Sequence, residues 1–176
     1  MSRSEMIKFL RSLSSDESSL VLKGLLDGNP ELLKKAYDCA IIAAAAVDAD
    51  RIGSEVFSSL DSLDYGDLNG RAGRTRYGYT EPDEAAWELF EEKLSPFIDE
   101  MVKNRDRALP AVAKEYCIGI IKGLLMFEKG STSDLKGWLQ DAPGEYIDTV
   151  VEEWAKGHPG SEDIAEVMRV VNGRSP

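Results

Sequence analysis

The sequence predicts an all-α protein of eight or nine helices, arranged as a stack of antiparallel helical pairs. Such a stack is either an α-solenoid resembling HEAT repeats or an irregular bundle. Apolar residues recur at helical spacing between capping signals, and no segment alternates with the period of two that a strand shows. Of the 176 residues, 43% are apolar, which is enough for a sizeable core. We therefore expect one all-α domain over residues 1–176.

The first half of the chain predicts three helices, over 15–27, 30–47 and 54–63. Gly28 is expected to stop the first of these helices. Pro30 suits the first position of the second helix, where the missing N–H of proline has no helical partner to lose.

A long helix over 83–100 is predicted next, because Thr80 and Asp83 resemble a capping box. One apolar stripe continues past Pro96, which favours a kinked helix, although a new helix starting there is the alternative. The stripe consists of Trp87, Phe90, Leu94, Phe97 and Met101. The remaining helices are expected at 110–128, 132–140, 144–156 and 162–172, with Gly130, Gly157 and Gly173 as left-handed residues at their ends.

Two segments, 36–47 and 111–127, are apolar around nearly their whole circumference, which is typical of buried helices. We expect both to form the centre of the fold, with Ile42 and Ile121 fully buried. Gly119 and Gly123 are small enough to let a neighbouring helix approach closely. The two cysteines, Cys39 and Cys117, lie within these segments and are expected to be reduced and sheltered.

A shift of 79 residues aligns the two apolar segments and places Tyr37 on Tyr116 and Ile41 on Ile120. This agreement raises an internal duplication of 16–63 and 95–142 as a hypothesis, which would favour stacked helical pairs. A second match in a conflicting register keeps chance agreement open as the alternative.

Residues 64–80 stand apart, with four glycines, three tyrosines and three arginines, and they read as neither helix nor strand. Guanidinium groups hold phosphates and stack on flat rings, so the segment is a candidate site for an anionic partner. The candidate binding residues are Arg71, Arg74, Arg76, Tyr77 and Tyr79. The alternatives are disorder, or docking of this basic loop onto the helix 83–100, whose net charge is −6.

Catalytic and metal templates find no match, so we expect neither an enzyme nor a cofactor. The single histidine, His158, lies in a Gly-His-Pro-Gly turn, and one histidine cannot supply a multi-histidine zinc site. Paired carboxylates remain the alternative, because two acids can perform acid–base catalysis. The acids considered are Asp48, Asp50, Asp61 and Asp64. Trp138 and Trp154 occur at helical positions and are interpreted as core anchors.

The net charge of −11 repels phosphate backbones and anionic membranes, so extensive nucleic-acid binding is disfavoured. Residues 2–13 carry charges and do not form a signal peptide. The longest uncharged apolar run, 39–47, is far shorter than the ~18 residues needed to cross a bilayer. The sequence predicts a cytoplasmic protein without a membrane anchor.

Residues 78–97 and 115–124 resemble parts of a helical module found in prokaryotic proteins beside SWIM-type zinc-binding domains. The resemblance covers roughly 78–156 and rests on helix-packing residues. The cysteine and histidine ligands of a SWIM module are absent here, so zinc binding is not implied. The resemblance implies a helical accessory domain without assigned activity. We expect a non-enzymatic scaffold that binds a protein partner, with a nucleic-acid-associated protein acting through 64–80 as the alternative.

Overall fold

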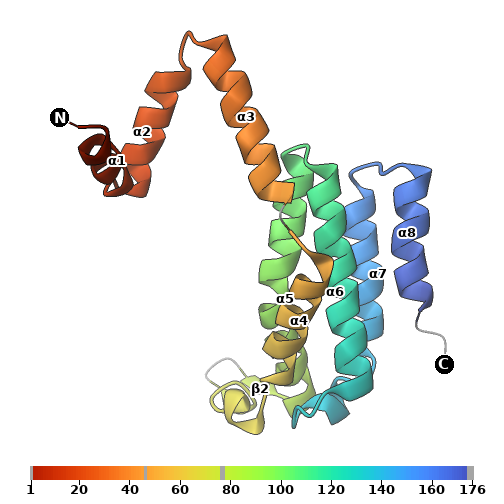
Figure 1. Cartoon of the computed structure of the whole chain (residues 1–176). Helices are drawn as coiled ribbons and strands as arrows, with labels where there is room; N and C mark the ends of the chain where they lie inside the picture. The colour runs from red at the N-terminus through yellow and green to blue at the C-terminus, as the bar shows by residue number, and fades with distance from the viewer. Residues whose placement is uncertain (1, 46, 76–77, 174–176) are drawn as a thin grey trace. The chain divides into compact units, whose positions relative to one another are not determined.

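A computed structural model describes residues 2–45, 47–75 and 78–173 of the chain. Eight α-helices account for most of these residues, which confirms the all-α class (Figure 1). The elements in chain order are α1 (Arg3–Arg11), α2 (Ser15–Leu26), α3 (Pro30–Ala45), α4 (Ala49–Asp61), the 3-10 turn η1 (Tyr65–Leu68), β1 (Gly73–Thr75), β2 (Gly78–Thr80), α5 (Pro82–Asp106), α6 (Pro110–Gly130), the 3-10 turn η2 (Lys136–Trp138), α7 (Ala142–Ala155) and α8 (Ser161–Asn172). Where the sequence predicts one domain, contacts within the chain fall into two units, Met1–Ala44 and Ala45–Pro176.

Local signals determine the helices of the first unit. Ser2 with Glu5 forms a capping box at α1, and Ser14 with Glu17 forms a second one at α2. In each box the serine hydroxyl accepts from the backbone N–H three residues on, and the glutamate accepts from the serine N–H. Gly28 has φ 76°, so the left-handed conformation that separates α2 from α3 requires glycine there.

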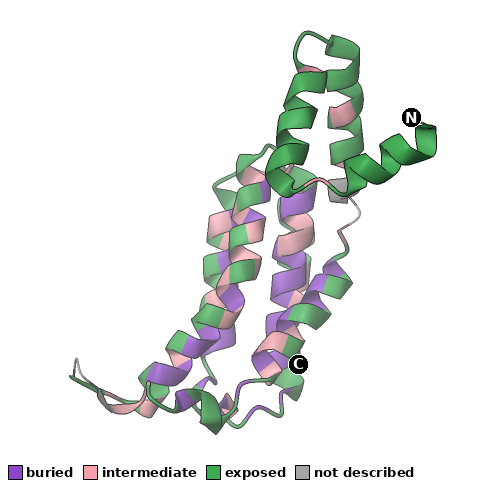
Figure 2. Cartoon of the chain, turned by 90° about the vertical axis from the view of Figure 1, so that its left-hand side faces the viewer, coloured by how far each residue is buried: buried purple, intermediate pink, exposed green. Residues whose placement is uncertain are grey.

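The first unit has no core of its own, and Figure 2 shows its helices almost entirely exposed. No residue from 2 to 42 is buried, and over the described part of this unit no two helices pack along each other. The predictions for Ile42 and Cys39 are therefore wrong, since Ile42 is 72% exposed and Cys39 is exposed. Ile42 follows Lys35 and Asp38 by seven and four residues, so it lies on the charged side of α3.

The second unit is a bundle with α6 at its centre, in contact with α4, α5, α7 and α8. Ile121 and Cys117 are completely buried on α6, as predicted for both residues. Phe127 of α6 meets Phe90 of α5 edge to face, with ring centroids 5.3 Å apart. Of the two helices predicted to be central, only the second occupies the centre of a core.

The helix that lies closest against α6 is α4 rather than the segment 36–47. A Cβ atom added to Gly119 would lie 2.6 Å from Cβ of Ile52, a distance that real side chains do not adopt. From the other side, a Cβ atom on Gly53 of α4 would come within 3.2 Å of the Gly119 carbonyl oxygen. Glycine on both surfaces therefore lets the two backbones approach, as the Gly119 and Gly123 pattern predicts.

The long helix α5 runs unbroken through Pro96, which confirms one helix instead of two. Its predicted stripe faces the core, with Phe90, Leu94 and Met101 fully buried. The helix begins differently from the prediction: Glu81 is the N-cap without a side-chain bond, and Thr80 ends strand β2.

The segment 132–140 was predicted to be helical, and that prediction is wrong, because only the short turn η2 forms there. Asp61 and Ser133 hold the segment in an irregular path, since the Ser133 hydroxyl donates to the Leu63 carbonyl at 2.6 Å. The proposed duplication would align this segment with α4. The other two helices that it would align, α3 and α6, differ in burial. The duplication stays a prediction.

Of the two tryptophans interpreted as core anchors, Trp154 of α7 is 4% exposed and belongs to the core. Trp138 is 40% exposed, and its ring meets Tyr65 edge to face with centroids 5.6 Å apart. None of the described helices combines the length and the apolarity that crossing a bilayer requires.

Candidate functional site

The segment 64–80, predicted to be neither helix nor strand, forms a short capped turn and a small hairpin. Asp64 accepts from the Gly66 N–H at 2.6 Å and caps η1. Strands β1 and β2 pair antiparallel, with Gly73 opposite Thr80 and Arg74 opposite Tyr79. Gly70, Gly73 and Gly78 all have positive φ. These glycines therefore adopt the left-handed backbone conformations that tight turns require.

The candidate binding residues of this segment are only partly described by the structure. Arg71 donates to Glu92 of α5 at 2.6 Å, which raises the pKa of Arg71 and lowers the pKa of Glu92. Tyr79 is 65% exposed. The Arg74 side chain, Arg76 and Tyr77 lie outside the described residues. For Arg71, docking onto the acidic helix is thus observed, as the alternative interpretation of the loop expects.

The four acids considered for acid–base chemistry each have a separate structural role. Asp48 caps α4 through the Asp50 N–H, and Asp50 accepts from Lys122 of α6 at 2.5 Å. Asp61 accepts from the Ser131 hydroxyl at 2.7 Å, and this bond is the largest cause of its lowered pKa. Asp64 caps η1. Each of these carboxylates is thus occupied by a cap, an ion pair or a hydrogen bond within the chain.

A cavity of about 350 Å³ lies where the ends of α5, α6, α7 and α8 meet. Its lining is mainly apolar, with Pro110, Trp154 and Pro159 beside the charged groups Arg105 and Asp163. This volume is within the range of small-ligand sites, so the cavity is a candidate binding pocket.

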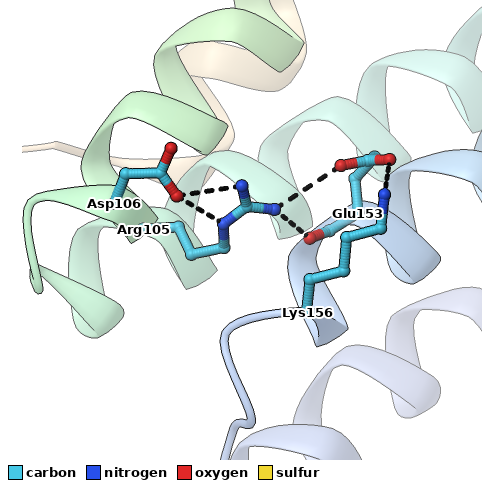
Figure 3. Close-up of polar contacts among 4 residues, drawn as sticks. All are labelled: Arg105, Asp106, Glu153 and Lys156. Atoms are coloured by element: carbon cyan, nitrogen blue, oxygen red, sulfur yellow. Dashed lines mark hydrogen bonds and ion pairs between the residues drawn. The ribbon is translucent and has the colours of Figure 1, made fainter.

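The charged groups of the cavity are already engaged in ion pairs, as Figure 3 shows for Arg105. Its guanidinium donates to the Asp106 carboxylate at 2.9 Å and to the Glu153 carbonyl at 2.6 Å. Lys156 also donates to the Glu153 carboxylate, and this bond is the main cause of the lowered Glu153 pKa. These contacts join the end of α5 to the end of α7, and they leave Arg105 no unbalanced charge for an anionic ligand.

On the other side of the cavity, Lys114 of α6 donates to Asp163 at 2.8 Å and to Glu166 at 2.7 Å. These two bonds raise the pKa of Lys114 and tie α8 to α6. No side-chain N or O atom that is buried in the described structure lacks a hydrogen-bond partner. The polar groups around the cavity therefore stabilise helix ends through bonds within the chain.

The chain leaves α7 through a left-handed residue, but that residue is His158 and not Gly157 as predicted. His158 has φ 52°, and Ala108 beside the cavity has φ 56°. Gly157 instead lies in a tight space, because a Cβ atom there would lie 3.0 Å from Cγ of Arg105. Gly130 and Gly173 likewise do not adopt the left-handed conformation.

The described residues contain no group of three or more His, Cys, Asp or Glu side chains placed to hold a metal ion. Within the same part of the chain, the hydrogen bond that His158 makes is a backbone one, from its N–H to the Ala155 carbonyl.

The most unusual surface lies in the first unit, where sequence analysis did not place a site. Of the eighteen large apolar side chains exposed among the described residues, twelve lie between Met6 and Ile42. Apolar surface of this extent marks a site of interaction with another protein or with a membrane. We call the apolar side chains of α1, α2 and α3 the N-terminal apolar surface. Its members are Met6, Ile7, Phe9, Leu10, Leu20, Val21, Leu22, Leu25, Leu32, Leu33, Tyr37 and Ile42.

In the sequence, the segment that carries this surface differs from the rest of the chain in its net charge. Residues 1–44 contain six Lys and Arg and six Asp and Glu, a net charge of zero. The remaining residues contain fifteen Lys and Arg and twenty-six Asp and Glu, and so carry the whole net charge of −11. The segment that carries the N-terminal apolar surface is therefore neutral overall, whereas the rest of the chain is strongly acidic.

Comparison with protein-family models, with curated protein sequences and with solved structures gives no match to this chain. The resemblance of 78–156 to the helical module found beside SWIM-type domains therefore stays a prediction.

Proposed function

We propose that this protein is a non-enzymatic helical scaffold that binds protein through its first three helices. The observation that carries the proposal is the N-terminal apolar surface, which holds twelve of the eighteen large apolar side chains exposed in the described structure. The second unit buries its own apolar side chains in a continuous core, from Ala49 to Val167. The first unit is then the segment that binds, and the second is a stable body that carries it.

The distribution of charge supports protein as the partner in place of nucleic acid or an anionic membrane. The binding segment is neutral, and the rest of the chain is strongly acidic, so neither part attracts phosphate groups. The nucleic-acid alternative depends on 64–80, where Arg71 is paired with Glu92. Of the three candidate arginines, the alternative therefore depends on Arg74 and Arg76.

The test is capture of binding partners by the full-length protein from a lysate of the cells that produce it. Wild type is compared with Leu22→Glu/Leu25→Glu, which places two carboxylates on the apolar side of α2. The matched control is Gly130→Glu/Gly137→Glu, which adds the same two charges outside the first unit. A Cβ atom at either of these exposed glycines meets no atom within 4 Å.

We expect wild type and the control to capture protein, a second copy of this chain included, and Leu22→Glu/Leu25→Glu to capture none. A fourth sample, Arg71→Ala/Arg74→Ala/Arg76→Ala, is expected to behave like wild type. Nucleic acid in the wild-type eluate that disappears only with the arginine variant would favour the alternative. Equal capture by all four samples would contradict the proposal.

A further inference from the structure

The three N-terminal helices contain nine, twelve and sixteen residues, so the first two are too short to be stable in water without a packing partner. Isolated helices shorter than about 12–15 residues are marginal in water, because most helical stability in proteins comes from packing of an apolar face. No residue from 2 to 42 is buried. Something must therefore cover the N-terminal apolar surface when these helices are stable.

The size of this surface matches one half of a stable dimer interface. Its twelve side chains are 39–72% exposed. Complete burial of one large apolar side chain removes about 60–120 Å² of apolar area from water. Burying the exposed half of all twelve would remove about 360–720 Å². A standard interface takes about 800 Å² from each partner, of which about 450–520 Å² is apolar.

Charge favours a second copy of this chain as the partner. The six positive and six negative charges of residues 1–44 balance, so two copies of this segment do not repel each other. The acidic remainder of the chain, by contrast, repels its own copy. Self-association through the neutral segment keeps the contact where the repulsion is least.

We propose that residues 2–45 of two copies pack together in a two-fold symmetric dimer, with each copy covering the N-terminal apolar surface of the other. The proposal rests on the proposed function and names its partner. A two-fold interface uses the same surface on both chains, so one patch suffices for both partners.

The test is the mass of the full-length protein in solution, measured by sedimentation or light scattering across a range of concentrations. The expected mass is twice the 19.4 kDa of one chain. Leu22→Glu/Leu25→Glu is expected to raise the dissociation constant at least about a hundredfold, because it places charges within the apolar contact. The control Gly130→Glu/Gly137→Glu is expected to remain dimeric. Equal thermal unfolding of the bundle in all three proteins shows that the body is intact.

A wild-type protein that remains monomeric at about 100 μM would overturn the dimer, since interfaces of this size reach micromolar affinity or better. If the protein is monomeric but captures a different protein through Leu22 and Leu25, this inference fails and the proposed function stands. If it is monomeric and captures nothing, both fail.

Discussion

Gly123 of α6 lies so close to Val56 of α4 that a Cβ atom added to the glycine would be 2.5 Å from Cβ of the valine. The same Cβ atom would be 2.8 Å from the carbonyl oxygen of Gly53. Backbone atoms cannot move aside as the end of a flexible side chain can. The distance between α4 and α6 therefore depends on the absence of a side chain at position 123.

Gly123→Ala is expected to destabilise the protein by about 1–3 kcal/mol, because the extra methyl group overpacks the contact with Val56 and Gly53. Denaturant unfolding measures the change. Gly130→Ala, in the last position of the same helix, serves as the control because its Cβ atom would meet nothing within 4 Å. The control is expected to be neutral or slightly stabilising. Equal losses for both variants would contradict the close packing of α4 and α6.

Ile42 and Ile121 are a matched pair with opposite surroundings, since they are 72% and 0% exposed. Ile121→Ala is expected to cost about 2–5 kcal/mol, because it leaves a cavity at the centre of the bundle. Ile42→Ala is expected to change the free energy of unfolding of the bundle by no more than about 0.5 kcal/mol, because Ile42 is not part of its core. A loss at Ile42 as large as the loss at Ile121 would contradict the absence of Ile42 from that core.

The two thiols are expected to react at very different rates with a thiol reagent under native conditions. Cys39 is exposed and should be labelled promptly. Cys117 is buried, and burial raises the pKa of its thiol to about 12, so the reactive thiolate is nearly absent at neutral pH. Labelling of Cys117 should require unfolding. Mass spectrometry of the labelled protein distinguishes the two sites, and Cys39→Ser is expected to abolish the fast reaction.

Asp61 is expected to make stability depend on pH in the acid range. Its pKa is lowered, chiefly by the Ser131 hydroxyl, with the backbone N–H groups of Thr132 and Ser133 also donating to it. A carboxyl group whose folded pKa is lowered stabilises the protein above its unfolded pKa of about 3.9. That stabilisation is lost as the pH falls through the lowered value.

Asp61→Asn is therefore expected to cost about 1–2 kcal/mol at pH 7 and progressively less as the pH falls below about 4. Denaturant unfolding of both proteins at several pH values measures the difference. Asp134→Asn, at an exposed position of the same irregular segment, is the control and is expected to change little. A cost that stays constant down to low pH would contradict the role of the Asp61 charge.

The sequence alone determined where most helices form, because the signals for a helix are local. Capping residues, proline at first positions and apolar spacing lie within a few residues of each other, and they predicted the all-α class and the continuity of α5 through Pro96. The segment 132–140 shows the limit of such signals. Its spacing resembles a helix, but hydrogen bonds to Asp61 and Leu63, some seventy residues away in the chain, hold it in another path.

Only the tertiary structure decided which apolar helix is central, because α3 and α6 have the same pattern in sequence. Burial depends on what packs against a helix, and that is not encoded in the helix itself. Gly119 and Gly123 of α6 pack closely against α4, so α6 lies in the core. In contrast, α3 is exposed, together with its residues Ile42 and Cys39. The N-terminal apolar surface follows from the same fact: an apolar stripe predicts that something will cover it, and the fold determines whether the cover comes from the chain's own core.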